Sequence, residues 1–420
     1  MIDQTILACG VRVLTERIPD VRSATIGIWA DVGSAIERPA RRGVSHLVEH
    51  MIFKGTPTRT ARAIAEQIDG IGGDLNAFTD KETTCYYARV MDRHVSLAID
   101  TLSDMFLHSL FDPAELEREQ SVVLDEIKMY DDSPDEILGD LFARTMWRGS
   151  QLGEPTIGYA ETVAALRADD LRDHMRRHYA PDAVIVAVAG NVEHHAVVAL
   201  LEQRFAAFRG RAERVVAETP LLTPAVAVRR KETEQAYVMF GARGLRAAHE
   251  DRYALAIADT VLGGGMSSRL FQEIRERRGL AYNVHSFEQT YRAAGLFGVY
   301  AGTSPENVQE CVDVIVDEVS LLARNGVTAA ELALAKEHLK GSLTLSLEST
   351  SARMMRLARN ELVFGRQITT EEVETAIDGT TLDDVARVAQ TLLAPESFGL
   401  CVLGPFDESD IRFEPRSAAA

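Results

Sequence analysis

The sequence has little of what defines several large classes of protein. Its four cysteines are widely scattered, and no pair has the spacing of a metal site or a redox motif: Cys9, Cys85, Cys311 and Cys401. A chain of 420 residues needs no disulfides for stability, so a reducing compartment fits best. No stretch approaches ~18 consecutive apolar residues, which argues against a membrane span. The N-terminus has no basic region followed by a long apolar run, so we expect no signal peptide and a cytoplasmic protein.

The chain also lacks an excess of basic residues. It has 45 lysines and arginines against 63 aspartates and glutamates, which gives a net charge of −18 at pH 7. Because nucleic-acid binding calls for a basic face, we expect no nucleic-acid partner. An acidic surface or chamber would attract basic peptides at long range. The plainer interpretation is that the negative charge serves solubility, and the sequence leaves both open.

A cluster of metal-binding residue types lies between Arg42 and Thr56. His46 and His50 are four residues apart, and Glu49 comes directly before His50. On a helix these three positions share one face. Two imidazoles one turn apart can hold one zinc ion, and a carboxylate beside them can take a proton from zinc-bound water. The order His-x-x-Glu-His is the inverted zinc-peptidase motif. The alternative is a buried helix with two incidental histidines.

A catalytic zinc site needs a third protein ligand and keeps one position open for water. The helix predicted at 113–131 is rich in carboxylates, which taken alone favours a solvated helix face. Glu119 and Glu126 differ from the others, because they lie two turns apart on one face with Val122 and Val123 between them. A carboxylate among apolar residues is costly unless it is paired or bound to a metal. These two glutamates therefore stand out among the candidates.

The order of predicted elements repeats along the chain. In each half, strands come first, then two helices, a hairpin, a run of helices and a last strand. This order favours an α+β fold of two similar domains related by duplication, each a mostly antiparallel sheet packed against a layer of helices. The predicted domains are 1–207 and 223–405, with a linker at 208–222 and a tail at 406–420.

On these motifs the sequence resembles the pitrilysin-type zinc metallopeptidases, and among them the subgroup of the mitochondrial processing peptidase and its bacterial relatives. In that family a glutamate follows the His-x-x-Glu-His motif at a distance, and here 75 residues lie between His50 and Glu126. The resemblance implies His46, His50 and Glu126 as the ligands of one zinc ion per chain, with Glu49 as the general base. Glu119 matches the family's carboxylate that orients a ligand histidine.

A short segment after the motif also carries the resemblance. Asn76-Ala77-Phe78-Thr79 matches the edge strand that pairs with substrate in this family. Such β-augmentation holds an extended peptide by backbone bonds, with little side-chain selectivity. Without the resemblance, the same residues predict only an ordinary hairpin edge.

The second half carries a match of its own. Arg275 and Tyr282 fit the family's arginine and tyrosine seven residues apart. The resemblance implies that they contact the scissile region of the substrate, where they could hold the carbonyl oxygen as charge develops. Arg277 and Arg278 are nearby alternatives for the arginine, and a helix-end arginine with a core tyrosine is the plainer interpretation.

The resemblance implies a zinc endopeptidase or oligopeptidase that hydrolyses short or unfolded peptides held as an extended strand. Larger family members carry four such domains in one polypeptide, whereas this chain has two. The resemblance therefore implies a homodimer that encloses a chamber. In this dimer the zinc site of one subunit is completed by Arg275 and Tyr282 of the partner subunit. One alternative is a non-catalytic partner or assembly subunit of a processing-peptidase-like complex. The sequence also leaves open a sister chain as partner, and dedicated maturation of one product against general peptide turnover.

Overall fold

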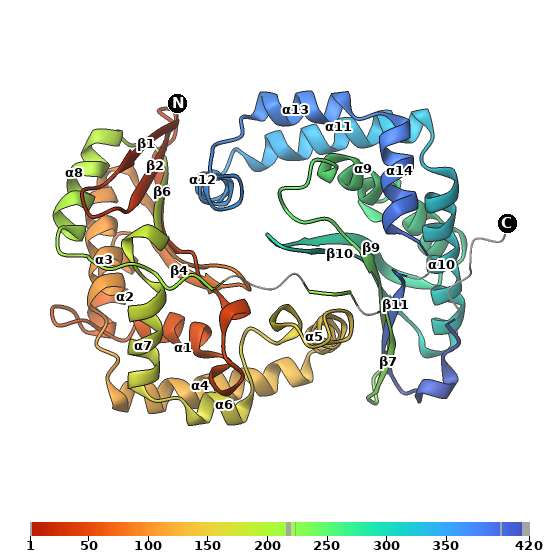
Figure 1. Cartoon of the computed structure of the whole chain (residues 1–420), viewed down its shortest axis with the longest axis horizontal. Coiled ribbons are helices and arrows are strands. Elements are labelled where there is room, and N and C mark those ends of the chain that lie inside the picture. The colour runs from red at the N-terminus through yellow and green to blue at the C-terminus, as the bar shows by residue number, and fades with distance from the viewer. Residues whose placement is uncertain (1, 216–219, 223, 395–396, 414–420) are drawn as a thin grey trace. The chain divides into compact units, whose positions relative to one another are not determined.

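Most strands and helices form where the sequence pattern predicts them in the computed structural model of the chain (Figure 1). The structure describes residues 2–215, 220–222, 224–394 and 397–413. The chain forms two compact units, each assembled from separate segments. Unit 1 consists of Met1–Lys128, Pro155–Ala217 and Ser346–Gln367, and unit 2 of Met129–Glu154, Glu218–Leu345 and Ile368–Ala420.

Unit 1 is built on a six-stranded sheet with the strand order β1-β2-β6-β3-β5-β4. The strands are β1 (Ile2–Ile6), β2 (Arg12–Arg17), β3 (Ser23–Ala30), β4 (Asp74–Thr79), β5 (Thr84–Met91) and β6 (Val184–Gly190). β2 and β6 run parallel, and the other neighbouring strands run antiparallel. The central strands β3 and β6 are buried along almost their whole length, as expected for apolar runs covered on both faces. β4 lies at one edge of the sheet.

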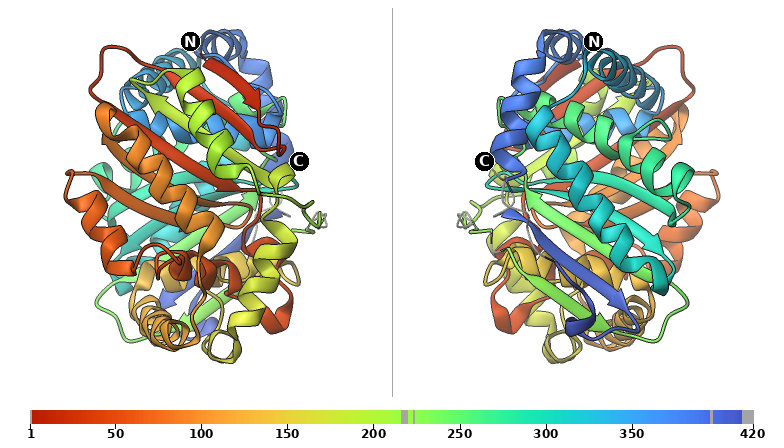
Figure 2. Two further views of the ribbon diagram at one scale, coloured as in Figure 1. Left: turned by 90° about the vertical axis from the view of Figure 1, so that its left-hand side faces the viewer. Right: turned by 90° about the vertical axis from the view of Figure 1, so that its right-hand side faces the viewer.

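Helices cover both faces of this sheet. α3 and α8 lie across one face, as the left panel of Figure 2 shows, and Leu47, Ile99 and Leu201 are buried in the core that they enclose. The helices of unit 1 are α1 (Val44–Ile52), α2 (Ala61–Asp69), α3 (Val95–His108), most of α4 (Pro113–Asp132), α6 (Ala160–Ala165), α7 (Ala168–His178), α8 (His194–Phe205) and α12 (Thr350–Phe364), with single turns at η1 (Ser34–Ile36), η2 (Pro39–Arg41), η3 (Asp92–His94) and η5 (Pro181–Ala183).

The second face of the unit 1 sheet is covered by α12, which comes from the second half of the chain. Met354 of α12 is fully buried, and its sulfur accepts a hydrogen bond from the Trp29 indole at 3.3 Å. Gly27 on β3 allows this close approach, because a Cβ at that position would collide with the Met354 side chain. The sheet is therefore completed by a helix that lies far from it in the sequence.

Unit 2 is built on a five-stranded sheet with the order β7-β11-β8-β10-β9. The strands are β7 (Val226–Arg230), β8 (Ala236–Arg243), β9 (Ala281–Thr290), β10 (Gly295–Thr303) and β11 (Gly399–Gly404). β7 and β11 run parallel, and the other neighbouring pairs run antiparallel. This is the order and direction of β2, β6, β3, β5 and β4 in unit 1, so the second sheet repeats the first without the β1 strand.

The helices of unit 2 cover its sheet in the same way. α9, α10 and α14 lie over one face (right panel of Figure 2), and their apolar side chains enclose a second core that includes Leu255, Ile315 and Val388. The helices of unit 2 are α5 (Pro134–Met146), α9 (Arg252–Gly263), the π-helix η6 (Phe271–Arg277), α10 (Val308–Asn325), α11 (Ala329–Ser346), α13 (Thr370–Gly379) and α14 (Leu382–Leu392), with single turns at η4 (Gln151–Gly153), η7 (Pro305–Asn307) and η9 (Glu408–Asp410).

The other face of the unit 2 sheet is covered by α5, which comes from the first half of the chain. Phe142 of α5 packs edge-on to Phe287 at 6.3 Å between ring centroids. Gly241 on β8 allows a similar close approach, because a Cβ there would collide with the Phe142 ring. Each half of the chain thus supplies one helix to the sheet of the other half: α5 covers the unit 2 sheet, and α12 covers the unit 1 sheet. We call this the helix exchange.

The predicted α+β fold with two similar, mostly antiparallel sheets is confirmed by these elements. The predicted domain boundaries differ from the packing, because a helix inside 1–207 belongs to unit 2 and one inside 223–405 belongs to unit 1. An apolar stripe indicates that a helix will be buried, but it does not say against which sheet. Residues 208–215 and 220–222 form no helix or strand, and the rest of the predicted linker lies outside the described residues.

Three local expectations need correction. The pattern of residues 161–178 predicts a single helix, but these residues form two, because Arg167 is extended and precedes the start of a new one. α13 was not predicted, since it buries only Ile377, although Thr369 caps its N-terminus. The tail predicted at 406–420 is packed at its start, where Ile411 is buried and the Phe413 ring lies 6.3 Å from the Phe240 ring between centroids. Residues 414–420 lie outside the described part.

In the described ranges, no helix is long and apolar enough to cross a membrane.

Candidate active site

The helix that carries the histidines begins at a backbone position suited to glycine. Gly43 precedes α1 with φ of 89°, in the left-handed region. The buried Glu37 carboxylate then accepts hydrogen bonds from the backbone N–H groups of Gly43 at 2.7 Å and Ser45 at 2.8 Å. Burial raises the pKa of Glu37 to about 7, although these bonds oppose the rise. A carboxyl group from outside the helix therefore satisfies donors at its N-terminus.

One face of α1 is buried and the other carries the motif. The apolar residues of the helix are fully buried: Val44, Leu47, Val48, Met51 and Ile52. His46 and His50 keep 14% and 21% of their side chains exposed, and they lie side by side with ring centroids 4.7 Å apart. The packing of the apolar face thus fixes the direction in which both imidazoles project.

The structure brings the three predicted ligands together. Nε2 of His46 lies 3.8 Å from Oε2 of Glu126, and Nε2 of His50 lies 3.7 Å from the same oxygen. One ligand atom from each residue lies within 4.8 Å of the others, and no other group of three or more metal-ligand residues occurs in the part of the chain that the structure describes. Ligand atoms around a tetrahedral zinc ion lie roughly 3.3–3.6 Å apart, so this set is nearly at the required separation.

The electrostatics of the cluster suit metal binding. Burial, together with the neighbouring His50, lowers the pKa of His46 to about 4. His46 is therefore neutral at pH 7, which leaves a lone pair available for a metal. Two imidazoles and a carboxylate form a donor set that zinc accepts.

His50 is held by the second predicted carboxylate. Its Nδ1 lies 3.1 Å from Oε2 of Glu119, which leaves Nε2 directed at Glu126. Glu119 is only 6% exposed, and its other oxygen lies 2.6 Å from the Lys54 ammonium group. The ion pair satisfies a carboxylate that would otherwise be buried without a cation. Sequence reasoning predicted the Glu119 contact and missed Lys54, although Lys54 follows His50 by four residues.

The predicted general base lies beside the cluster. Oε2 of Glu49 accepts a hydrogen bond from the Thr79 hydroxyl at 2.6 Å. Burial raises the pKa of Glu49, while the Thr79 bond lowers it. A carboxylate with a raised pKa accepts a proton more readily near neutral pH. Thr79 had been expected only as part of a substrate strand, and its contact with Glu49 was not predicted.

The segment Asn76-Ala77-Phe78-Thr79 lies on β4, at the edge of the unit 1 sheet. It pairs with β5 on one side, and no described strand pairs with the other. Ala77 packs against the core under α3 and α8, and Phe78 packs against the cluster under α12. The centroid of the Phe78 ring lies 5.4 Å from that of Trp29. What the edge offers is mainly its backbone N–H and C=O groups.

Arg275 and Tyr282 lie together in unit 2. The Arg275 guanidinium stacks over the Tyr282 ring at 4.4 Å and over the Phe271 ring at 4.8 Å. Tyr282 is 77% exposed and stands at an irregularity in the β9–β10 pairing, which skips it between Ala281 and Asn283. Such a bulge can redirect a side chain.

The alternatives to Arg275 have other partners. Arg277 pairs with Glu273, and Arg278 lies 3.2 Å from Glu310. Among the three arginines, the described contacts therefore link only Arg275 to Tyr282.

A duplicated α+β fold with an inverted His-x-x-Glu-His helix and a distant glutamate defines a class of metallopeptidases. Residues 12–159 match the profile described as insulinase (peptidase family M16), and residues 165–339 match that of the peptidase M16 inactive domain. Over 396 residues the chain is 43% identical to an uncharacterized zinc protease of Bacillus subtilis, a match that covers 94% of this chain and 96% of the relative. The chain belongs to peptidase family M16, the pitrilysin-type metallopeptidases.

Further relatives share this assignment. An uncharacterized zinc protease of Streptomyces coelicolor is 43% identical over 413 residues, which covers 96% of this chain and 90% of that protein. Among solved structures, a protease from Helicobacter pylori has a TM-score of 0.89 at 23% identity and covers 96% of this chain and 99% of its own. A peptidase M16 inactive domain from Pseudomonas fluorescens also has a TM-score of 0.89, at 20% identity, over 97% and 98% of the two chains. The solved structures support the fold alone.

Proposed function

We propose that the chain is a zinc-dependent endopeptidase or oligopeptidase that hydrolyses short or unfolded peptides. The observation that carries this proposal is the convergence of His46, His50 and Glu126, whose ligand atoms lie within 4.8 Å of one another. Glu49, on the same helix, stands beside this cluster. Membership of a peptidase family and the zinc protease names of the relatives support the same conclusion.

His46, His50 and Glu126 would hold a single zinc ion in each chain. Zinc supplies a Lewis acid that polarises the peptide carbonyl and makes a water molecule more acidic. Glu49 then takes the proton from the attacking water. Thr79 fixes one oxygen of the Glu49 carboxylate, and the other oxygen has no hydrogen-bond partner among the described residues. That second oxygen is suited to receive the proton, while Glu119 keeps His50 in position.

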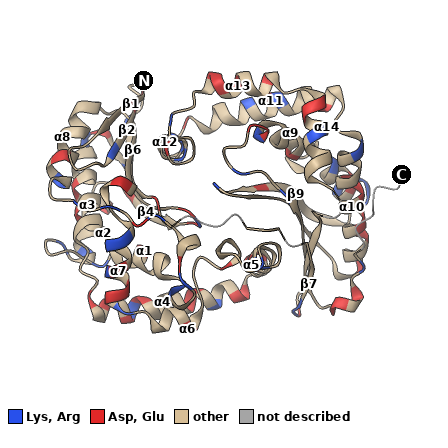
Figure 3. Ribbon diagram, viewed as in Figure 1, with Lys and Arg blue, Asp and Glu red and all other residues tan. Residues whose placement is uncertain are grey.

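The substrate would bind as an added strand on β4. Its free edge starts with the exposed Asn76 and ends at Thr79, which contacts the base. Backbone pairing along this edge would place an extended peptide next to Glu49 with little dependence on its side chains. The net charge of −18 favours basic peptides at long range. Figure 3 shows acidic residues distributed over the helices of both units, so any such attraction comes from the whole chain.

The proposed assembly is a homodimer that encloses a chamber. In it, Arg275 and Tyr282 of the partner subunit would complete the zinc site of the first. Their stacked arrangement and the exposure of the Tyr282 ring support a role in contacting a ligand, and a guanidinium and a phenol can both donate to a carbonyl oxygen. We place the protein in the cytoplasm, and its four unpaired cysteines support this compartment.

The decisive experiment combines metal content with cleavage. The purified protein should contain about one zinc per chain and cleave a library of unstructured peptides, and Glu49→Gln should keep the zinc and lose nearly all cleavage. Glu66→Gln, on the exposed face of α2, is the matched control and should cleave normally. Full cleavage by Glu49→Gln would rule out the proposed base. A zinc-loaded wild type without cleavage would favour the alternative, a non-catalytic partner subunit.

A further inference from the structure

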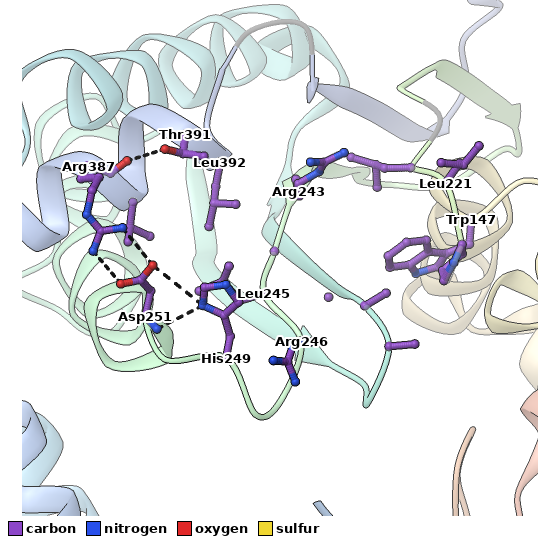
Figure 4. A pocket seen from close by; sticks show the side chains of 17 residues that line it. Trp147, Leu221, Arg243, Leu245, Arg246, His249, Asp251, Arg387, Thr391 and Leu392 are labelled. Carbon is purple, nitrogen blue, oxygen red and sulfur yellow. Dashed lines mark hydrogen bonds and ion pairs between the residues drawn. The ribbon is translucent and has the colours of Figure 1, made fainter. Parts of the chain in front are cut away.

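A cavity of about 500 Å³ lies in unit 2, among residues that the proposed function does not use. It is enclosed by Trp147 after α5, the loop that follows β8, the turn between β9 and β10, and the C-terminal half of α14 (Figure 4). Pro220, Leu221 and Leu222 close it from another side. This volume is typical of a site for a small ligand or the end of a peptide.

The walls of this cavity are mostly apolar. Trp147, Leu245 and Leu392 line it and are 2%, 9% and 4% exposed. Leu221 lines it as well, although 82% of that residue is exposed in the absence of a ligand. A ligand with an apolar side chain would therefore cover surface that now faces water.

The polar groups in the cavity are mainly donors that lack acceptors. The Trp147 indole N–H is buried and has no hydrogen-bond partner in the described part of the chain. Arg243 and Arg246 also line the cavity, and within the described ranges neither contacts a carboxylate. Both arginines are exposed, so they bring to the cavity a positive charge that no carboxylate of the described chain neutralises.

The remaining charges in the cavity neutralise one another. Arg387 makes two hydrogen bonds to Asp251, at 2.9 Å and 2.6 Å, and His249 lies 3.9 Å from the same carboxylate. Figure 4 shows this group on one side of the cavity and Trp147 on the other, with Arg243 and Arg246 between them. The cavity is thus locally positive in a chain whose net charge is −18.

We propose that this cavity binds the C-terminal residue of a peptide that ends in an apolar side chain. Arg243 or Arg246, which lie on different sides of the cavity in Figure 4, would bind the terminal carboxylate, since a guanidinium matches a carboxylate in a two-point contact. The leucines and the Trp147 ring would enclose the apolar side chain. Peptides with free ends are the substrates and products of a peptidase, so the choice of a peptide rests on the proposed function. Binding at this site needs neither zinc nor Glu49.

The test uses the full-length chain with Trp29→Phe and Glu49→Gln in the presence of a chelator. Because the chain has two tryptophans, Trp147 then remains as the single tryptophan, whose emission can be excited selectively. Acetyl-Leu-Leu with a free carboxylate is titrated by fluorescence and by calorimetry, beside its C-terminal amide and beside decanoate, a fatty-acid carboxylate. The free acid should bind about tenfold or more tighter than the amide, as expected for charge-assisted hydrogen bonds. At least one of Arg243→Met and Arg246→Met should weaken binding of the free acid, and Arg62→Met, at an exposed arginine of unit 1, should not.

Equal binding of the acid and the amide would overturn the carboxylate assignment, and so would unchanged binding in both arginine variants. Tighter binding of decanoate than of the peptide would overturn the choice of a peptide. Absence of both heat and fluorescence change at millimolar peptide would overturn the site. Since hydrolysis is disabled throughout, these outcomes are independent of whether the wild type cleaves peptides.

Discussion

Lys54 and Glu119 form an ion pair at the edge of the histidine cluster, with 2.6 Å between the ammonium nitrogen and one carboxylate oxygen. The other oxygen of Glu119 lies 3.1 Å from His50. The lysine therefore both neutralises a buried carboxylate and fixes which oxygen faces the imidazole. Support of a ligand histidine by a carboxylate commonly strengthens metal binding.

We expect Lys54→Met to weaken zinc binding by about 10–100-fold, the usual effect of losing an outer partner of a metal ligand. Zinc affinity is measured by competition with a chromophoric chelator, so the result does not depend on activity. Lys128→Met is the control, because Lys128 pairs with Asp125 on the exposed face of α4. If both variants bound zinc like the wild type, Lys54 would have no role in positioning His50.

We expect Thr79→Val to lower kcat with little change in KM, because the lost hydroxyl orients Glu49. The hydrogen bond from Thr79 lowers the pKa of Glu49, so its removal should raise that pKa. The base must be deprotonated to act, and the acid limb of the pH–rate profile should therefore move to higher pH. Thr79→Ser keeps the hydroxyl, so it should have the kcat and the acid limb of the wild type. A variant that changed KM alone would instead assign Thr79 to substrate binding.

We expect Glu37 to make stability depend on pH. Its pKa is raised from 4.5 to about 7 in the folded chain, so the folded state binds the proton more tightly than the unfolded state does. The resulting stabilisation is complete below pH 4.5 and is lost as the pH rises through 7. Since one pKa unit corresponds to about 1.4 kcal/mol, the loss is at most about 3–4 kcal/mol.

Glu37→Gln cannot titrate and serves as the reference for this effect. The unfolding free energies of both proteins are measured in urea at about pH 5 and about pH 8, on either side of the raised pKa. The wild type should lose stability relative to the variant over this interval. Parallel pH profiles would show that Glu37 keeps its ordinary pKa in the folded chain.

We expect Gly27→Val to destabilise unit 1 by about 1–3 kcal/mol, because the added side chain would push Met354 of α12 away from the sheet. Gly139→Ala is the matched control: it lies inside α5, and a Cβ there meets nothing within 4 Å. Alanine at that position should stabilise the helix by about 0.5–1 kcal/mol. Denaturant unfolding compares the two, and equal midpoints would contradict the tight contact at Gly27.

The elements and the histidine cluster differ in how far the sequence could predict them. The spacing of His46, Glu49 and His50 predicts a shared helix face, because helix geometry is local. The link to Glu126 came from the resemblance to a known family, since no local pattern relates residues on two separate helices. The Lys54–Glu119 pair and the Thr79–Glu49 bond depend on how α4 and β4 pack against α1. One sequence does not show that packing.

The helix exchange was beyond prediction for a related reason. The apolar stripes of α5 and α12 indicate burial, yet each helix suits either sheet on composition alone. What selects the partner is shape, as the glycines at 27 and 241 show, where the absence of a side chain admits a methionine in one unit and a phenylalanine in the other. Such complementarity is visible only once both surfaces are known.

The exchange also bears on how the protein is made. During synthesis on the ribosome, the strands and first helices of unit 1 emerge early, but the helix that covers the second face of their sheet, Thr350–Phe364, emerges only after β7 to β10 of unit 2. Until then, the apolar face around Trp29 and Leu14 remains uncovered. A nascent chain in this state has a strong tendency to associate through that face. The late helix therefore makes the completed chain, and not its first half, the unit that reaches the native state.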